Sequence, residues 1–140
     1  MIALGPAAGR IKNWPRDDVL LVTCAPGTVA AGVFTQNRFC AAPVIVCREH
    51  LALQHEGGAP MRALVVNAGN ANAGTGQPGL AAARQTCAAV GRLLDCAPEA
   101  VLPYSTGVIM EPLPVDRIVA ALPAALAGSR EDGWYAAARA

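Results

Sequence analysis

The stretch PYSTGVI at residues 103–109 places hydroxyl side chains and a glycine directly after a short apolar run. Hydroxyl and backbone N–H groups that gather at the end of a strand can donate hydrogen bonds to the oxyanion that develops during acyl transfer. An ordinary polar turn has the same composition, because Ser, Thr and Gly are common in turns. The residues alone leave both interpretations open.

A second stretch, VVNAGNANAGTGQPGL at residues 65–80, contains three asparagines and four glycines between an apolar run and an alanine-rich run. Gly74 to Gly79 formally match the GxGxxG pattern of dinucleotide-binding sites. However, Pro78 removes a backbone donor, and Asp95 falls at the end of the following helix instead of the next strand. An ordered loop, in which Asn side chains bond nearby backbone and the chain crosses other backbone closely, fits better. Long structured loops of this kind are often functional.

Metal and thiol chemistry are less well supported. Cys40, Cys47, His50 and His55 match no zinc spacing, and the two histidines diverge around a helix. We expect both histidines to face solvent beside a buried Cys47. Nothing local orients a base for a Cys–His nucleophile pair. The residues therefore predict no metal site and no cofactor site, and they provide an oxyanion-type loop without a nucleophile, as in part of an active site.

Strand and helix patterns alternate along the chain, which indicates a mixed α/β class. We expect strands at residues 19–23, 29–34, 42–47, 63–66 and 101–104, the first two forming a hairpin around residues 25–27. We expect helices at residues 48–56, 80–94, 114–126 and 131–140. Pro123 is expected to break or kink the third of these helices.

Length, charge and cysteine content narrow the function classes. The chain has 140 residues, enough for one domain or part of one, and a net charge of +1 with no basic run, which argues against nucleic acid as a partner. The hairpin expected within residues 19–37 argues against a membrane span there, and the first residues lack a signal-peptide pattern.

Five cysteines without a CxxC pair predict buried free thiols in a reducing cytosol. The final WYAAARA helix lacks a cap, which suggests that the chain, or a partner, continues it.

Three stretches together resemble the ArgJ family, the bifunctional ornithine acetyltransferases and N-acetylglutamate synthases of arginine biosynthesis. They are AGVFTQNRFCAAPV (31–44), VVNAGNANAGTGQPGL (65–80) and STGVIMEPLP (105–114), and the GRIK start (9–12) and WYAAARA end also fit. The resemblance covers nearly all of the chain. It implies the layered sheets and helices of the DmpA/ornithine-acetyltransferase-like fold, an α/β (α+β) class, of which this chain would be the N-terminal part.

The family resemblance also implies a mechanism and partners. The family's precursor cleaves itself into α and β chains, which assemble as a cytoplasmic α2β2 heterotetramer without a cofactor. A threonine at the start of the β chain takes acetyl from N-acetylornithine and passes it to glutamate. Its own α-amine can serve as the base, so no histidine is needed. Acetyl-CoA as a second acetyl source is left open.

By the same resemblance, Thr106 and Gly107 form the oxyanion hole, Thr106 through its hydroxyl and Gly107 through its backbone N–H. Met110 stands where the family motif usually has glycine, and the nucleophile lies outside the chain. Residues 1–140 are thus expected to be a single incomplete domain, the N-terminal portion of the α chain, inactive alone. The loop at 65–80 is expected to be a scaffold beside the acyl-transfer site. The alternative is a non-catalytic fragment or binding module derived from this fold.

Overall fold

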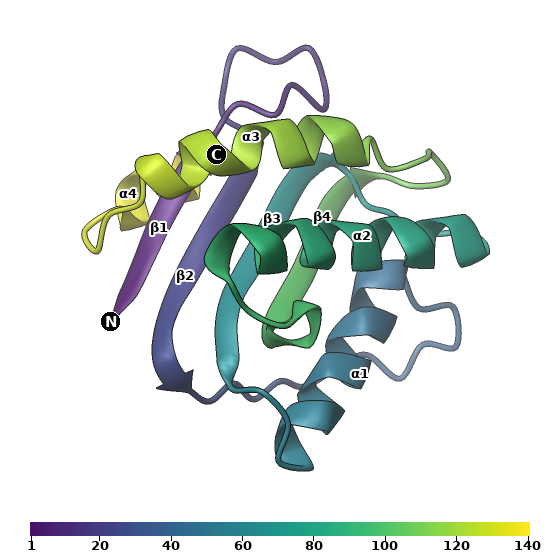
Figure 1. The fold of residues 1–140 in the computed structure, drawn as a ribbon. Helices are drawn as coiled ribbons and strands as arrows, with labels where there is room; N and C mark the ends of the chain where they lie inside the picture. The colour runs from purple at the N-terminus through teal and green to yellow at the C-terminus, as the bar shows by residue number, and fades with distance from the viewer.

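The computed structural model describes residues 1–140 and shows a mixed sheet with helices packed on one side of it (Figure 1). The strands, in spatial order, are β1 (Ile2–Ala7), β2 (Val19–Thr28), β3 (Met61–Asn70) and β4 (Val101–Val108). The helices are α1 (Ala42–His55), α2 (Gly76–Leu94), α3 (Val115–Ala127) and α4 (Trp134–Arg139), and a 3-10 turn, η1 (Pro98–Ala100), precedes β4. The predicted mixed α/β (α+β) class is confirmed.

Strand direction changes within the sheet. The pairs β1–β2 and β2–β3 are antiparallel, whereas β3 and β4 are parallel. Parallel neighbours need a crossover connection, and α2 provides it between β3 and β4. Because parallel strands end at the same edge, this crossover brings the residues that follow β3 and those that follow β4 together.

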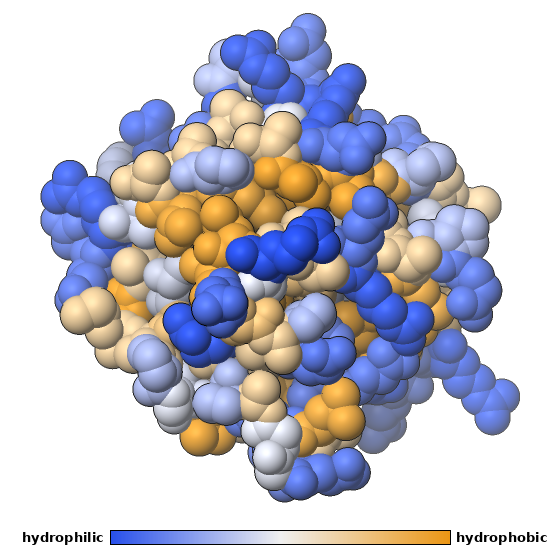
Figure 2. Space-filling model, in the orientation of Figure 1, coloured by the Kyte–Doolittle hydropathy of each residue, from blue (hydrophilic) through white to orange (hydrophobic).

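One face of the sheet forms the core with the helices. Along β2 and β3, alternate side chains such as Val19, Leu21 and Val65 are almost completely buried. They pack with Val46 of α1 and with apolar residues of α2 and α3 in one hydrophobic cluster. Figure 2 views this helix-covered side, where hydrophobic surface is still visible between hydrophilic side chains. The helices therefore bury this side of the sheet.

The opposite face carries the other alternate residues. Leu20, Val22, Leu64 and Val66 are only half-buried there, and Tyr104 is exposed. We call these five residues the open face. Leu20 pairs with Val66, and Val66 pairs with Tyr104, so the face runs across three neighbouring strands. The helices α2 and α3 lie on the other side. Toward β4, α1 borders the open face, because Leu102 is buried with Cys47 and Leu51 of α1 and Leu64 packs against this cluster. Leu20, Val22 and Val66 form an apolar sheet surface outside the main core.

The predicted strand at residues 42–47 is wrong, because these residues form the first half of α1. Pro43 sits in the first helical turn, where its missing N–H costs nothing. A short apolar run is compatible with a buried strand or a buried helix, and here packing against β4 and α2 decides for the helix. The predicted helix at 48–56 is the second half of α1, which ends at His55 before Gly57.

The predicted hairpin is also wrong in its second strand. Residues 29–34 form no strand, and the partners of β2 are β1 and β3. The sequence IALGPA does not predict the strand β1, because glycine and proline are both uncommon in strands. Pro6 is tolerated there because β1 is at the edge of the sheet.

The remaining elements follow the predictions with longer or shorter bounds. The strands expected at 63–66 and 101–104 extend to form β3 and β4, and the helix expected at 80–94 begins at Gly76. Pro123 does not break the helix, since α3 continues through it to Ala127. The final helix is shorter than expected and covers Trp134–Arg139. None of the helices combines the length and apolar character needed to cross a bilayer.

Candidate active site

The two predicted functional stretches lie side by side at the carboxyl ends of β3 and β4. Ala68 pairs with Thr106, and Gly69 pairs with Gly107. Thr106 and Gly107 are both exposed. Side chains alternate along β4, so Thr106 projects on the same face of the sheet as Tyr104, whereas Ser105 projects on the helix-covered face. The Thr106 side chain therefore projects on the same side of the sheet as the open face.

Gly107 is required by a close approach of two backbones. Its φ is +132°, and a Cβ atom added to it would lie 2.3 Å from the carbonyl carbon of Gly69 and 2.6 Å from the amide nitrogen of Asn70. Real Cβ atoms do not approach backbone so closely. Only glycine lets the β4 chain cross the end of β3 at this point.

Three buried asparagines give the loop at residues 65–80 its internal bonding. The exposed fraction is 3% for Asn67, 1% for Asn70 and 0% for Asn72. The Asn72 N–H donates to Asn70 Oδ1 at 2.8 Å, and Asn72 Nδ2 donates to the Gly79 carbonyl at 2.9 Å. The Thr75 hydroxyl donates to Asn72 Oδ1 at 2.8 Å. The prediction of an ordered, internally bonded loop is confirmed, because each buried amide finds partners nearby.

The same loop holds the residues that follow Gly107. Asn70 Nδ2 donates to the carbonyls of Glu111 at 3.2 Å and Pro112 at 3.1 Å. Backbone bonds join Ala71 N–H to the Val108 carbonyl and Met110 N–H to the Ala73 carbonyl, both at 2.8 Å. The segment 108–112 is therefore attached to the 65–80 loop along its length.

Met110 adopts a backbone conformation that favours glycine. Its φ is +63°, in the left-handed region, and its side chain is 74% exposed. A Cβ atom added to Gly74 would lie 3.0 Å from Met110 Cγ, so the methionine chain lies over Gly74. A side chain in this region raises the conformational energy of the segment.

A loop between β1 and β2 closes the other side of the site. The Asp18 carboxylate accepts N–H groups of Gly9 and Ile11 at 2.6 Å and of Arg10 at 3.0 Å. Asp18 is 2% exposed, so these bonds lie in the interior. Lys12 Nζ then forms a 2.6 Å ion pair with Glu111 of the segment 108–112. Asp18 and Lys12 belong to no catalytic or binding pattern in the sequence, although Lys12 is part of the GRIK stretch that contributed to the family resemblance.

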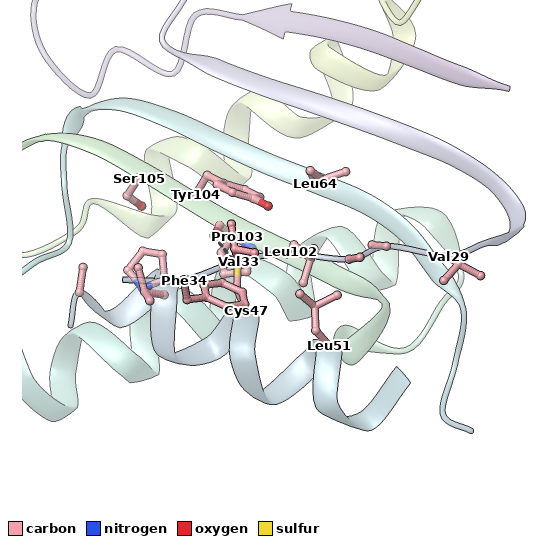
Figure 3. Close-up of a pocket in the computed structure, with 16 residues that line it drawn as sticks. Val29, Val33, Phe34, Cys47, Leu51, Leu64, Leu102, Pro103, Tyr104 and Ser105 are labelled. Carbon is pink, nitrogen blue, oxygen red and sulfur yellow. Dashed lines mark hydrogen bonds between the residues drawn. The ribbon is translucent and has the colours of Figure 1, made fainter. Parts of the chain in front are cut away.

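An apolar cavity lies next to the site. Its volume is about 500 Å³, and residues 29–34, α1, β3 and β4 line it (Figure 3). Ser105 and Tyr104 lie at its β4 wall, and Cys47 faces it from α1. Burial raises the pKa of the Cys47 thiol to about 11 and also raises the pKa of Tyr104. Cys47 is thus protonated at neutral pH and is a poor nucleophile.

The expected histidine positions are half right. His55 is exposed, but the prediction for His50 is wrong: it is 6% exposed, and its Nδ1 lies 2.7 Å from the Val101 carbonyl. Because residues 42–55 form one helix, His50 lies on the same buried stripe as Val46 and Cys47 and faces β4.

All five cysteines are free, and Cys24, Cys47 and Cys87 are buried. No group of three or more His, Cys, Asp or Glu residues is placed to hold a metal ion.

Comparisons with known proteins agree on one family. The ArgJ family model matches residues 3–140. The "arginine biosynthesis bifunctional protein ArgJ" of Methylococcus capsulatus is 58% identical over 139 residues, which cover 99% of this chain and 33% of that protein. The chain thus spans about a third of the length of this curated relative.

Two solved structures share the fold. One is the arginine biosynthesis bifunctional protein ArgJ of Bacillus halodurans, with a TM-score of 0.76 and 33% identity over 85% of this chain and 60% of that one. The other is the ornithine acetyltransferase of Mycobacterium tuberculosis complexed with ornithine. Its TM-score is 0.81, with 32% identity over 92% of this chain and 67% of that one.

Proposed function

The chain belongs to the ArgJ family, and from this premise we propose that it is the N-terminal part of the α chain of an acetyltransferase of arginine biosynthesis. The proposed enzyme moves acetyl from N-acetylornithine to glutamate. The names of the relatives support the pathway and the reaction class, since one is an arginine biosynthesis protein and another an ornithine acetyltransferase.

The observation that carries the proposal is the Thr106–Gly107 pair. It lies exposed at the end of β4, and buried hydrogen bonds and a glycine-only backbone crossing hold the chain on both sides of it. A donor site that must match a tetrahedral intermediate needs this preorganisation. An ordinary polar turn does not need three buried asparagines behind it.

In the proposed reaction, the hydroxyl oxygen of a β-chain threonine attacks the acetyl carbonyl of N-acetylornithine. The threonine's α-amine takes the hydroxyl proton. The carbonyl oxygen becomes an oxyanion that accepts hydrogen bonds from the Thr106 hydroxyl and the Gly107 N–H. The C–N bond then breaks, the ornithine amine receives the proton, and acetyl remains on the threonine as an ester. Attack by the glutamate amine on this ester forms N-acetylglutamate and frees the threonine.

The proposal assigns this chain one share of the work. It contributes the oxyanion hole, whereas the nucleophile comes from the β chain and most substrate contacts lie outside residues 1–140, in a cytoplasmic α2β2 assembly without a cofactor. Two observations support a requirement for further chain. Leu20, Val22 and Val66 of the open face lie outside the main core. The chain also spans only about a third of the length of its relative from Methylococcus capsulatus. Inside the chain, protonated Cys47 and buried His50 offer no competing nucleophile and base. Alone, residues 1–140 form an incomplete and inactive domain.

Intact-mass analysis of the protein purified natively from its own source is the first test. We expect a co-purifying chain that begins with threonine, and transfer of labelled acetyl from N-acetylornithine to glutamate by the purified assembly. A lone, soluble chain of 14.3 kDa without a partner and without acetyl transfer would contradict the proposal. That result would favour the alternative, a non-catalytic fragment or binding module derived from the fold.

A further inference from the structure

We propose that Asn67 and Ser105 form a positioning pair that sets the geometry of the Thr106–Gly107 oxyanion hole. This inference rests on the proposed function and deepens it, because it names residues that act on the hole without touching the substrate. The two residues face each other in the register of β3 and β4, one position before the pairs that contain Thr106 and Gly107.

The contact between them is short and partly buried. The Ser105 hydroxyl donates to Asn67 Oδ1 at 2.6 Å, and Asn67 Nδ2 donates to the Asn70 carbonyl at 2.8 Å. Asn67 is 3% exposed and Ser105 is half-buried. One amide therefore connects the residue before Thr106 to the residue whose amide nitrogen lies against Gly107.

The position of Asn67 in β3 indicates that its amide is there to bond Ser105 and Asn70. Ala63 and Val65 precede it on the helix-covered face of β3 and belong to the apolar core. An apolar residue would continue this pattern, whereas a buried amide is unfavourable unless its groups are bonded. The strand could form without the amide, but Ser105 would then have no partner on β3.

A second amide acts on the other side of the hole. Asn70 Nδ2 holds the carbonyls of Glu111 and Pro112, which follow Gly107. With Asn67 holding Ser105, the Thr106–Gly107 segment is attached on both sides to the end of β3. Rotation of β4 about its own axis would break the Ser105–Asn67 bond. The bond therefore fixes the direction in which the Thr106 hydroxyl projects.

The test compares Ser105→Ala with Ser129→Ala in the complete native assembly. Both substitutions remove one hydroxyl that donates one hydrogen bond from a half-buried position, but the Ser129 hydroxyl bonds the Ala125 carbonyl at the far end of α3. We expect Ser105→Ala to lower kcat about 10- to 100-fold with KM changed less than about twofold, because a misplaced donor weakens transition-state binding. Ser129→Ala should leave both values unchanged.

Ser105→Thr restores the hydroxyl and should recover most of kcat. If Ser105→Ala does not fold, Ser105→Thr and Ser105→Val repeat the comparison with and without a hydroxyl on residues that favour strands. The comparison is Ser105→Ala against the unmodified protein, or Ser105→Val against Ser105→Thr. In both comparisons, equal kcat with and without the hydroxyl would overturn the positioning role while the acetyltransferase proposal stands. An unmodified assembly that transfers no acetyl would overturn both.

Discussion

Thr106 and Gly107 lie next to each other but serve the site in different ways. Gly107 is determined by packing, because any side chain would collide with Gly69 and Asn70. Thr106 is exposed, and no contact in the chain requires a threonine there. A substitution at Gly107 would test folding and chemistry together, so Thr106 is the better place to test chemistry alone.

We predict that Thr106→Ala lowers turnover of the assembled enzyme by ~10²–10³-fold, the typical loss for one oxyanion donor. Thr106 is exposed, so the free energy of unfolding should change little. The assay is acetyl transfer from N-acetylornithine to glutamate, with urea unfolding alongside it. Thr106→Ser keeps the hydroxyl and serves as the matched control. A fully active Thr106→Ala enzyme would remove Thr106 from the hole.

Met110 allows a test of backbone strain. We predict that Met110→Gly stabilises the protein by about 1 kcal/mol, because glycine adopts a positive φ without the cost that an L side chain carries. Little packing is lost, since the methionine is mostly exposed. Met110→Ala is the control, because alanine removes the long side chain and keeps the strain. Urea midpoints measure both variants, and an equal midpoint for glycine and alanine would contradict the prediction.

At the scale of the elements, the site is the meeting point of three connections. The loop after β3 and the segment after β4 come together because the α2 crossover makes these strands parallel. The β1–β2 loop reaches the same place through the Lys12–Glu111 ion pair. That ion pair is partly exposed and contributes little by itself. The buried Asp18 carboxylate is therefore the main determinant of the shape of this loop.

We predict that Asp18→Asn destabilises the protein by about 2 kcal/mol. Both carboxylate oxygens accept backbone N–H groups, so whichever way the new amide turns, its NH₂ group faces at least one donor. Asp17→Asn is the matched control, because the neighbouring Asp17 is less buried and should shift the free energy of unfolding by no more than about 0.5 kcal/mol. Equal urea midpoints for the two variants would argue against the role of Asp18.

At the scale of the whole molecule, the two faces of the sheet differ. Helices α1–α3 pack on one face in the main core, whereas Leu20, Val22 and Val66 of the open face lie outside that core. Toward β4, α1 borders the open face, since Leu64 packs against the cluster that contains Cys47 and Leu51. A contiguous apolar surface of this kind marks an interaction site. The Thr106 side chain projects on this same face, so the chain that covers the open face would also pass close to the oxyanion hole.

We predict that Val66→Lys leaves the isolated chain folded and reduces its self-association. Val66 lies in the middle of the open face, where a lysine can reach solvent. Val65→Lys is the matched control: Val65 is 2% exposed on the helix-covered face, and a buried charge there should unfold the chain. Circular dichroism reports folding and analytical ultracentrifugation reports association. Unfolding of both variants would show that the open face is buried in solution.

Local chemistry along the chain is enough to predict several parts of this protein. The long helix α2, the buried strands β3 and β4, the mixed class and the internally bonded loop all followed from periodicity and from residues with strong backbone preferences. The hydroxyls and the glycine after the last strand were also visible, but their local chemistry fitted an ordinary polar turn as well. The assignment of Thr106 and Gly107 as an oxyanion hole came from the family resemblance and stays a prediction.

The remaining features become visible in the folded molecule, because they depend on residues far apart in the chain. Residues 42–47 form a helix, not a strand, because of the elements against which they pack, and His50 is buried as a result. One of the two partners of β2 is β1, a strand that cannot be recognised from its own composition. The bond between Ser105 and Asn67 joins residues 38 positions apart. A local pattern shows which groups can act, and the pairing of β3 with β4 places them together.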